Sequence, residues 1–161
     1  MRISFRRLRE SIRGLMRGLI GLFGGLAIAA CQAESRPVRL GEEECAHCRM
    51  RVMTAEYAAE LVTRKGRQYV FDDAVCLVSF LRAQPAVAEQ AHQLLVADYN
   101  HPTHWLPVAE AAFMRSPQLR TPMNGQTAAF ASNAEAQSAA HKLNPPGEIL
   151  SWLNVREHLA R

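Results

Sequence analysis

Residues 57–81, YAAELVTRKGRQYVFDDAVCLVSFL, contain the pattern that decides the fold. Apolar residues dominate 57–64 and 68–71, and a Lys-Gly turn signal joins these two runs. The aspartate pair that follows, Asp72 and Asp73, suits the start of a helix, because aspartate side chains accept hydrogen bonds from the first free backbone N–H groups. The stretch therefore predicts a β-hairpin followed by a helix.

The helix and the strand after it complete one ββαβ unit. Apolar residues between Val75 and Leu81 give the helix an apolar face, and Pro85 is expected to end it. Residues 92–99, HQLLVADY, have the apolar composition of another strand.

The same order of elements recurs in the second half of the chain. Residues 105–114 (WLPVAEAAFM) are expected to hold a strand, with Pro107 weakening its start. A short strand follows at 128–131, and Ser132 opens a capping box before an alanine-rich helix. Residues 148–152 (EILSW) are expected to form the closing strand.

These two blocks predict a repeated architecture. Their strand-to-helix junctions, at Phe71 and Phe130, lie 59 residues apart. We predict an α+β fold made of two tandem ββαβ units, residues 45–100 with the CxxCxM motif and residues 101–161. One continuous α+β sheet with accidental similarity is the alternative.

The first thirty residues have the composition of an export signal. Six arginines accompany an apolar run of thirteen residues, which is too short to span a bilayer as a helix. Leu26 to Cys31 (LAIAAC) resembles a bacterial lipobox, so Cys31 is the expected lipidation site. Simple cleavage near Ala30, which leaves a soluble periplasmic protein, is the alternative. We therefore predict a signal peptide at 1–30, then the lipidated cysteine and a polar tether at 31–44.

The positive net charge belongs to this signal. The chain has 19 basic and 15 acidic residues and a formal net charge of +4. Six of the basic residues and only one of the acidic residues lie in the first thirty positions, so the remaining part of the chain is close to neutral. Nucleic acid is therefore not an expected partner.

The segment Cys45-Ala-His-Cys48-Arg-Met50 carries the expected chemistry. Thiolate and thioether form a soft ligand set that selects Cu(I), whereas a thioether adds little to a zinc site. Cys48 and Met50 are the expected primary ligands, because side chains at i and i+2 share one side of an extended segment. For Cys45 three roles stay open: a third ligand, a disulfide partner of Cys48, or a bystander.

Further ligand candidates lie outside this motif. Met123 is expected from the second unit, because it lies in a Pro/Gly-bounded loop where an apolar side chain has little packing role. His104, between the units, is another candidate, because neutral imidazole binds copper. Cys76, at the start of the first helix, is a ligand or a small buried apolar residue, and it is not among the expected primary ligands.

With these features the chain resembles the NosL family of copper-binding lipoproteins. The matching segments, in order, are the lipobox at Cys31, the motif at 45–50, Phe-Asp-Asp…Cys at 71–76, and Pro-Met-Asn-Gly at 122–125 followed by Phe-Ala-Ser at 130–132. Family members commonly have glycine where Arg49 stands, so either a glycine backbone is not required there or the turn differs. Asn124 is a mild departure from the family's Met-Gly, because asparagine tolerates a left-handed φ.

The resemblance implies a membrane-anchored copper chaperone with two ββαβ domains that delivers Cu(I) for maturation of nitrous oxide reductase. We accordingly expect a carrier rather than an enzyme, held by lipid at the cell membrane and facing the periplasm. Its expected partner is a copper-accepting enzyme or the maturation complex of that enzyme.

Two other classes compete with this interpretation. A thioredoxin-type oxidoreductase places its CxxC at a helix start, whereas here the acidic run 42–44 opposes thiolate formation and residues 49–52 alternate like a strand. A structural zinc module would draw on three cysteines and a histidine, but the chain lacks a second CxxC and a histidine pair with three to five residues between its members. Phosphate-binding loops, nucleophile elbows and HExxH motifs are absent from the sequence.

Overall fold

The computed structural model describes residues 35–159. The predicted signal peptide, the lipidation site Cys31 and the first residues of the tether lie outside the described residues. Within the described part, none of the helices combines the length and the apolar character needed to cross a membrane.

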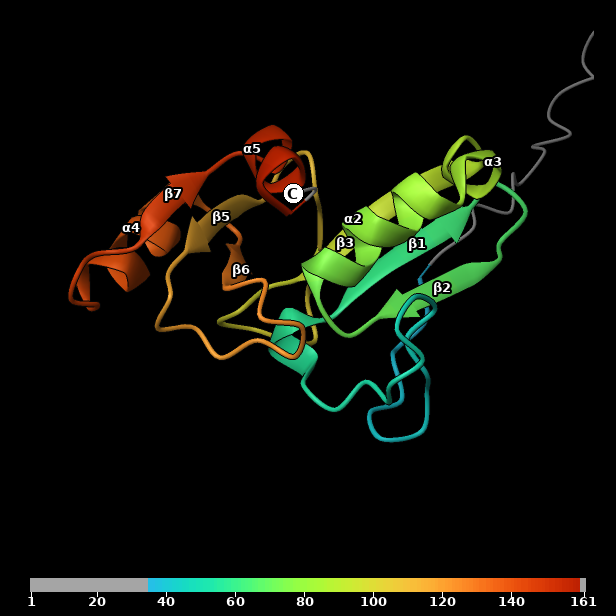
Figure 1. Cartoon of the computed structure of the whole chain (residues 1–161), viewed down its shortest axis with the longest axis horizontal. Coiled ribbons are helices and arrows are strands. Elements are labelled where there is room, and N and C mark those ends of the chain that lie inside the picture. The colour runs from blue at the N-terminus through green and yellow to red at the C-terminus, as the bar shows by residue number, and fades with distance from the viewer. Residues whose placement is uncertain (1–34, 160–161) are drawn as a thin grey trace, which may run out of the picture. The chain divides into compact units, whose positions relative to one another are not determined.

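The predicted hairpin supplies two adjacent strands of the first sheet, and the predicted helix packs on one face of that sheet (Figure 1). The strands of this sheet are β1 (Ala59–Thr63), β2 (Gln68–Phe71), β3 (Ala91–Ala97) and β4 (Trp105–Pro107), in the order β2-β1-β3-β4. All five residues of β1 are buried, because β2 and β3 flank it and α2 (Ala74–Ala83) lies across one face of the sheet (Figure 1).

Asp73 caps this helix as predicted. Its side chain accepts a hydrogen bond from the backbone N–H of Val75 at 3.0 Å. The helix ends at Ala83, and Pro85 then occupies the first position of the short helix α3 (Pro85–Ala88), where its missing N–H costs nothing.

The second sheet repeats the topology of the first. Its strands are β5 (Ala112–Arg115), β6 (Thr127–Phe130) and β7 (Glu148–Leu150), in the order β6-β5-β7, with α4 (Asn133–His141) between β6 and β7. In both sheets the first strand of the unit lies between the second and the third. Ser132 caps α4 by accepting from the backbone N–H of Glu135 at 3.3 Å. The α+β fold with tandem ββαβ units is thus confirmed.

Residues 105–114 differ from the single strand that the sequence predicts. They form two strands in different sheets: β4 pairs with β3, and β5 is the central strand of the second sheet. Pro107 is accommodated because β4 is an edge strand, where a missing backbone N–H disrupts no ladder. The division expected between residues 100 and 101 would therefore separate β4 from its hydrogen-bonding partner.

The C-terminal segment also differs from the prediction. The expected strand 148–152 ends at Leu150, and Trp152 begins a helix, α5 (Trp152–Leu159), that the sequence pattern did not reveal. The indole of Trp152 stacks on Phe113 of β5 with 5.6 Å between ring centroids. Val155 is the fully buried residue of this helix, and Trp152 and Leu159 are half-buried against the main apolar cluster.

Part of the expected tether is folded onto the first unit. We call residues 35–53 the strap. Its Arg36 forms a bidentate ion pair with Glu43 at 2.6 and 2.7 Å, and the backbone N–H of Gly41 donates to Val52 at 2.8 Å. Ser35 reaches the buried Glu60 of β1 with a 2.6 Å hydrogen bond. The polar side chains of this segment therefore form ion pairs and hydrogen bonds on the surface of the first unit, and the segment is not a free linker from residue 35 onward.

The apolar core joins the two units. The main cluster of buried residues contains Phe71 and Leu77 from the first unit together with Phe113, Ala129 and Val155 from the second. The backbone N–H of Tyr99 also donates to Ala129 at 2.8 Å, beyond the end of β3.

Candidate metal centre

The motif at 45–50 forms the tight end of the strap. The backbone N–H of Cys45 donates to the carbonyl of Met50 at 2.7 Å, and that of Arg49 donates to Cys45 at 3.1 Å. Arg49 has φ +68°, in the left-handed region. The expectation of an extended segment from Cys48 to Met50 is therefore wrong, because the chain reverses direction between them.

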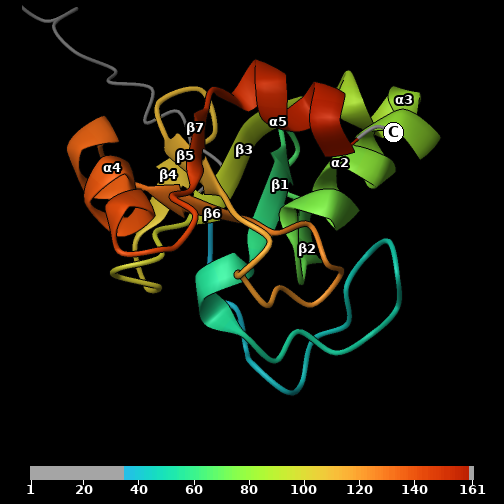
Figure 2. The same cartoon turned by 60° about the vertical axis from the view of Figure 1, so that its left-hand side comes forward.

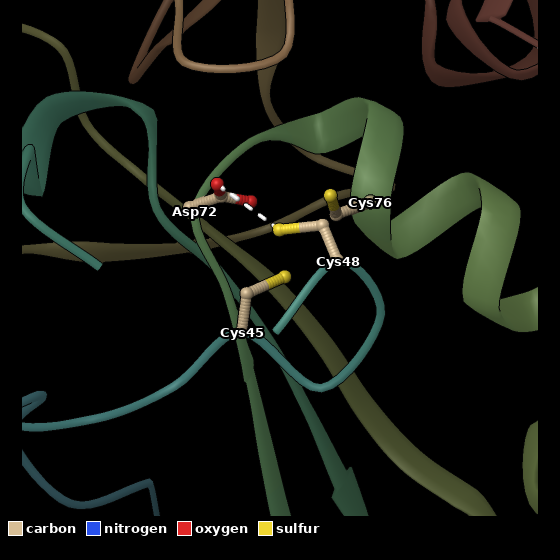
Figure 3. A group of neighbouring side chains, drawn as sticks. All are labelled: Cys45, Cys48, Asp72 and Cys76. Atoms are coloured by element: carbon tan, nitrogen blue, oxygen red, sulfur yellow. Dashed lines mark hydrogen bonds between the residues drawn. The ribbon is translucent and has the colours of Figure 1, made fainter. Parts of the chain in front are cut away.

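Four side chains from three elements meet inside this turn. Cys45 and Cys48 come from the turn, Asp72 from the end of β2 and Cys76 from the first turn of α2 (Figure 3). One potential ligand atom of each lies within 4.8 Å of the corresponding atoms of the other three. The backbone N–H of Ala46 donates to Val70 at 2.8 Å and so fixes the turn against β2.

The cluster has a buried side and an accessible side. Cys45 and Cys76 are fully buried, and Asp72 is 1% exposed. Cys48 is half-buried and its thiol donates to Asp72 Oδ2 at 3.4 Å. The other oxygen, Oδ1, is buried without a hydrogen-bond partner. An unpaired carboxylate oxygen is costly in a buried site, and a bound cation would compensate it.

The hydrogen bonds divide the three thiols into unlike groups. A hydrogen bond from Cys76, helped by backbone bonds at His47, Cys48 and Asp72, lowers the pKa of Cys45 to about 6. Burial is the chief cause that raises the pKa of Cys48 to about 11. The bond to Cys45, together with burial, raises the pKa of Cys76 well above that of a free thiol. The structure therefore favours one buried thiolate beside two protonated thiols.

The acidic run 42–44 does not oppose this thiolate as expected. Glu43 is neutralised by its ion pairs with Arg36 and Arg39. The hydrogen bonds that Cys45 accepts outweigh the desolvation of its sulfur. The acidic run therefore does not disfavour the thiolate as the sequence predicts, because the ion pairs of Glu43 form only in the folded chain.

The remaining expected ligands occupy different places. Met50 is 46% exposed on the outside of the turn. Met123 is half-buried in the loop 116–126 between β5 and β6, which we call the clamp loop; Figure 2 shows it reaching the start of α2. The backbone N–H of Met123 donates to Asp73 at 3.0 Å, directly beside Asp72.

His104 is not part of the cysteine cluster. It lies at the start of β4, and β2, which leads into Asp72, is the opposite edge strand of the sheet. Three strand spacings of about 4.8 Å separate these edges, roughly 14 Å in all. The imidazole of His104 instead lies 4.0 Å from the carboxylate of Asp98. His47 is exposed and does not belong to the group of four either.

Two members of the cluster were not expected as primary ligands. Asp72 was expected as a helix cap, and for Cys76 the roles of ligand and of small buried apolar residue both stayed open. Cys76 is indeed fully buried, but it is buried against two other thiols. The spacing of Asp72 and Cys76, one helical turn apart at a helix start, is the sequence signal that places both groups on one side.

The three cysteines are free thiols in this structure. The accessible thiol, Cys48, is the one with the raised pKa, and the thiolate-prone Cys45 is buried. A disulfide oxidoreductase needs an accessible low-pKa thiol. The CxxC also lies in a turn rather than at a helix start. This arrangement disfavours thiol–disulfide catalysis and favours the binding of a soft metal ion.

Comparisons with known proteins found a family match and a similar fold. The family model NosL matches residues 37–160. The fold is similar to the crystal structure of the copper chaperone NosL from Shewanella denitrificans, with a TM-score of 0.60 and 19% sequence identity over 73% of this chain and 92% of that chain. No curated protein matches the sequence.

Proposed function

Because this chain belongs to the NosL family, we propose that it is a carrier that binds Cu(I) and passes it to a copper enzyme. The observation that carries the proposal is the meeting of three thiols, one of them accessible, at the end of β2 and the start of α2. The solved structure that shares this fold is described as a copper chaperone, not as an enzyme.

The donor set suits a monovalent soft ion. Thiolates and thioethers select Cu(I) over hard cations. Cys45 supplies a thiolate near neutral pH, and metal binding would displace the protons of Cys48 and Cys76. In the metal-free protein, where Cys48 keeps its proton, the carboxylate of Asp72 accepts from this thiol and orients its sulfur before the ion binds.

Accessibility on one side suits transfer. The buried thiols of Cys45 and Cys76 retain the ion, whereas the half-buried Cys48 and the exposed Met50 offer an entrance for a partner's thiolate or thioether. A partner ligand can then join before the last carrier ligand leaves, which lowers the barrier to exchange. Met123 would add a thioether from the second unit.

We further propose that the protein is a lipoprotein anchored through Cys31 and exposed to the periplasm. The lipobox-like segment 26–31 supports this placement, and the strap begins four residues after the anchor, so the first unit would lie close to the membrane. Nitrous oxide reductase is the proposed recipient, on the strength of the resemblance to NosL proteins. Mass spectrometry of the protein purified from membranes tests the anchor, because Cys31→Ser should abolish the lipid adduct and release the protein.

Anaerobic titration with Cu(I) in the presence of bicinchoninate tests the carrier function. We expect one Cu(I) per chain, no electron paramagnetic resonance signal and no strong visible absorption. The Cys48→Ser variant should lose its Cu(I) to bicinchoninate. An intense Cu(II)–thiolate band in the loaded protein, or failure of the wild type to compete with the chelator, contradicts the proposal.

Zinc is the second candidate, because Cys₃Asp is also a competent tetrahedral zinc set and Asp72 Oδ1 lacks a partner. Loading the apo protein with equimolar Zn²⁺ and Cu(I) under argon separates the two functions. Retention of copper after desalting supports the carrier, whereas retention of zinc and a zinc-dependent unfolding midpoint indicate a structural zinc module.

A further inference from the structure

We propose that Asp73 is a positioning residue for metal binding, which holds the clamp loop and its Met123 against the segment that carries Asp72 and Cys76. This inference rests on the proposed function, because it assigns the second unit a part in the copper site. It concerns a residue that contributes no ligand atom of its own to the cysteine cluster.

The two carboxylate oxygens of Asp73 have separate tasks. Oδ1 accepts from the backbone N–H of Val75 at 3.0 Å and caps α2. Oδ2 accepts from the hydroxyl of Thr121 at 2.6 Å and from the backbone N–H of Met123 at 3.0 Å. Asp73 is fully buried, so all three bonds are shielded from water.

The second unit shows what a cap alone requires. Ser132 occupies the equivalent N-cap position, with nearly the same backbone angles, φ −149° and ψ 156° against φ −156° and ψ 151° for Asp73. One hydroxyl that accepts from Glu135 caps α4. The second oxygen of Asp73 therefore exceeds the needs of the helix, and it is this oxygen that binds the clamp loop.

The clamp loop has a conformation that needs to be held in place. Asn124 and Gln126 adopt φ +57° and +54°, in the left-handed region; asparagine tolerates this region, whereas Gln126 has no such allowance and is held there at a steric cost. The hydroxyl of Thr121 accepts from the backbone N–H of Gln126 at 3.2 Å while it donates to Asp73. The bonds to Asp73 thus fix both ends of the strained stretch.

Gly125 shows how closely the loop approaches the first unit. A Cβ atom at this position would lie 2.5 Å from Val75 Cγ2 and 2.7 Å from Asp73 Oδ1. The loop backbone therefore packs directly on the first residues of α2. Any larger residue at 125 would push Met123 away from this helix start.

One short segment connects this contact to the cysteines. Asp72 accepts from Cys48, the next residue binds Met123, and the backbone N–H of Cys76 donates to the carbonyl of Asp73 at 3.0 Å. Residues 72–76 are therefore a common support for the thiols of the first unit and for the thioether of the second. Loss of the Oδ2 contacts would free Met123 while the cysteine cluster stays in place.

Cu(I) affinity, measured by competition with bicinchoninate, tests the inference. Asp73→Ser keeps a capping oxygen and removes the second acceptor, and Thr121→Val removes the hydroxyl while it keeps the shape. Both variants should bind Cu(I) about tenfold more weakly, in the range typical of lost supporting contacts. Thr121→Ser should restore affinity. Ser132→Ala, the matched loss of a cap, should lower the unfolding midpoint and leave Cu(I) affinity unchanged.

A double-mutant cycle separates positioning from stability. If Asp73 acts through the Met123 thioether, Asp73→Ser should cause no further loss in a Met123→Leu background; additive losses would overturn the inference. The inference would also be overturned if Thr121→Val and Asp73→Ser both bound Cu(I) as tightly as the wild type while Met123→Leu bound it more weakly. That outcome would leave the carrier function intact. If the wild type does not compete with bicinchoninate, the proposed function itself fails. Should Asp73→Ser not fold, Thr121→Val decides the question alone.

Discussion

At the scale of single residues, Cys45 and Cys48 have opposite properties although they share one turn. The pKa of Cys45 is lowered to about 6 but its sulfur is fully buried, and the pKa of the accessible Cys48 is raised to about 11. Alkylation requires an accessible thiolate. The metal-free native protein should therefore react slowly with iodoacetamide at pH 8, at roughly a hundredth of the rate of a free cysteine.

Mass spectrometry of the alkylated peptides checks this prediction. The rate at Cys48 should rise about tenfold for each pH unit from 8 to 10, because the thiolate fraction grows until the pKa near 11 is reached. Urea-unfolded protein, in which all thiols react quickly, is the control. Rapid modification of Cys48 in the folded protein at pH 8 would show that its thiol is not held in the protonated form.

Arg49 provides a second prediction at this scale. Its φ of +68° is costly for a residue with a Cβ atom, and glycine adopts this angle freely. Arg49→Gly should therefore raise the free energy of unfolding by about 0.5–1 kcal/mol, after allowance for the greater freedom of glycine in the unfolded chain. Urea unfolding measures the change.

A glycine two residues further along, at Arg51, is the control for Arg49. Arg51 has an ordinary φ and donates to the carbonyl of Gly41 at 2.8 Å, so Arg51→Gly should destabilise the protein. Equal destabilisation by both substitutions would mean that the turn does not hold Arg49 in the left-handed region.

At the scale of elements, the sequence predicted what local chemistry determines. The hairpin, the caps of α2 and α4 and the closing strand of each unit follow from turn residues, capping side chains and apolar runs. Trp152, Val155 and Leu159 of α5 have the i, i+3, i+7 spacing of one helix face. The helix was missed because Trp152 was assigned to the expected strand 148–152, which left only a short segment after it.

The candidate site shows the same division. The motif at 45–50 is readable because its residues are adjacent, and Asn124 was correctly expected to tolerate a left-handed φ. The place of Asp72 and Cys76 beside the motif depends on the strap folding back onto β2, which is a tertiary event. His104 looked similar to a ligand in sequence, but the strand order of the sheet places it at the opposite edge.

The strap itself yields a pH-dependent prediction. Its ion pair with Arg36 lowers the pKa of Glu43 to about 2, from an ordinary value of 4.5. A carboxylate with a lowered folded-state pKa stabilises the protein fully above about pH 5, and this stabilisation is lost as the pH falls toward 2. Because Arg36 is half exposed, the contribution is discounted to about 1 kcal/mol.

Arg36→Gln should therefore cost about 1 kcal/mol at pH 7, and the difference from wild type should shrink by more than half at pH 3. Urea unfolding at both pH values measures it. Arg39→Gln is the matched control, because Arg39 is more exposed and its contacts with Glu42 and Glu43 are longer, at 3.4 and 3.7 Å. A wild-type advantage that stays constant with pH would exclude the ion pair as its source.

At the scale of the whole molecule, the two repeats cannot be independent domains. Phe113, Ala129 and Val155 of the second unit lie in the same buried cluster as the core of the first, and Asp73 bonds the clamp loop across the units. A carrier whose donors come from both halves needs such a shared core, because independent motion of the units would vary the distance between Met123 and the cysteines. The chain should therefore unfold in one cooperative transition.

The two tryptophans report on this cooperativity separately. Trp105 lies in β4 of the first sheet and Trp152 begins α5 beside the second. Trp105→Phe and Trp152→Phe each leave one fluorescent reporter, and their urea midpoints should coincide with the midpoint seen by circular dichroism.

Val155→Ala removes a fully buried side chain and should cost about 2 kcal/mol of the free energy of unfolding. Since Val155 packs in the shared cluster, the Val155→Ala substitution should lower the urea midpoints of both tryptophan reporters equally. A shift confined to the Trp152 signal would mean that the two units unfold independently and that the proposed copper site is not held by a common core.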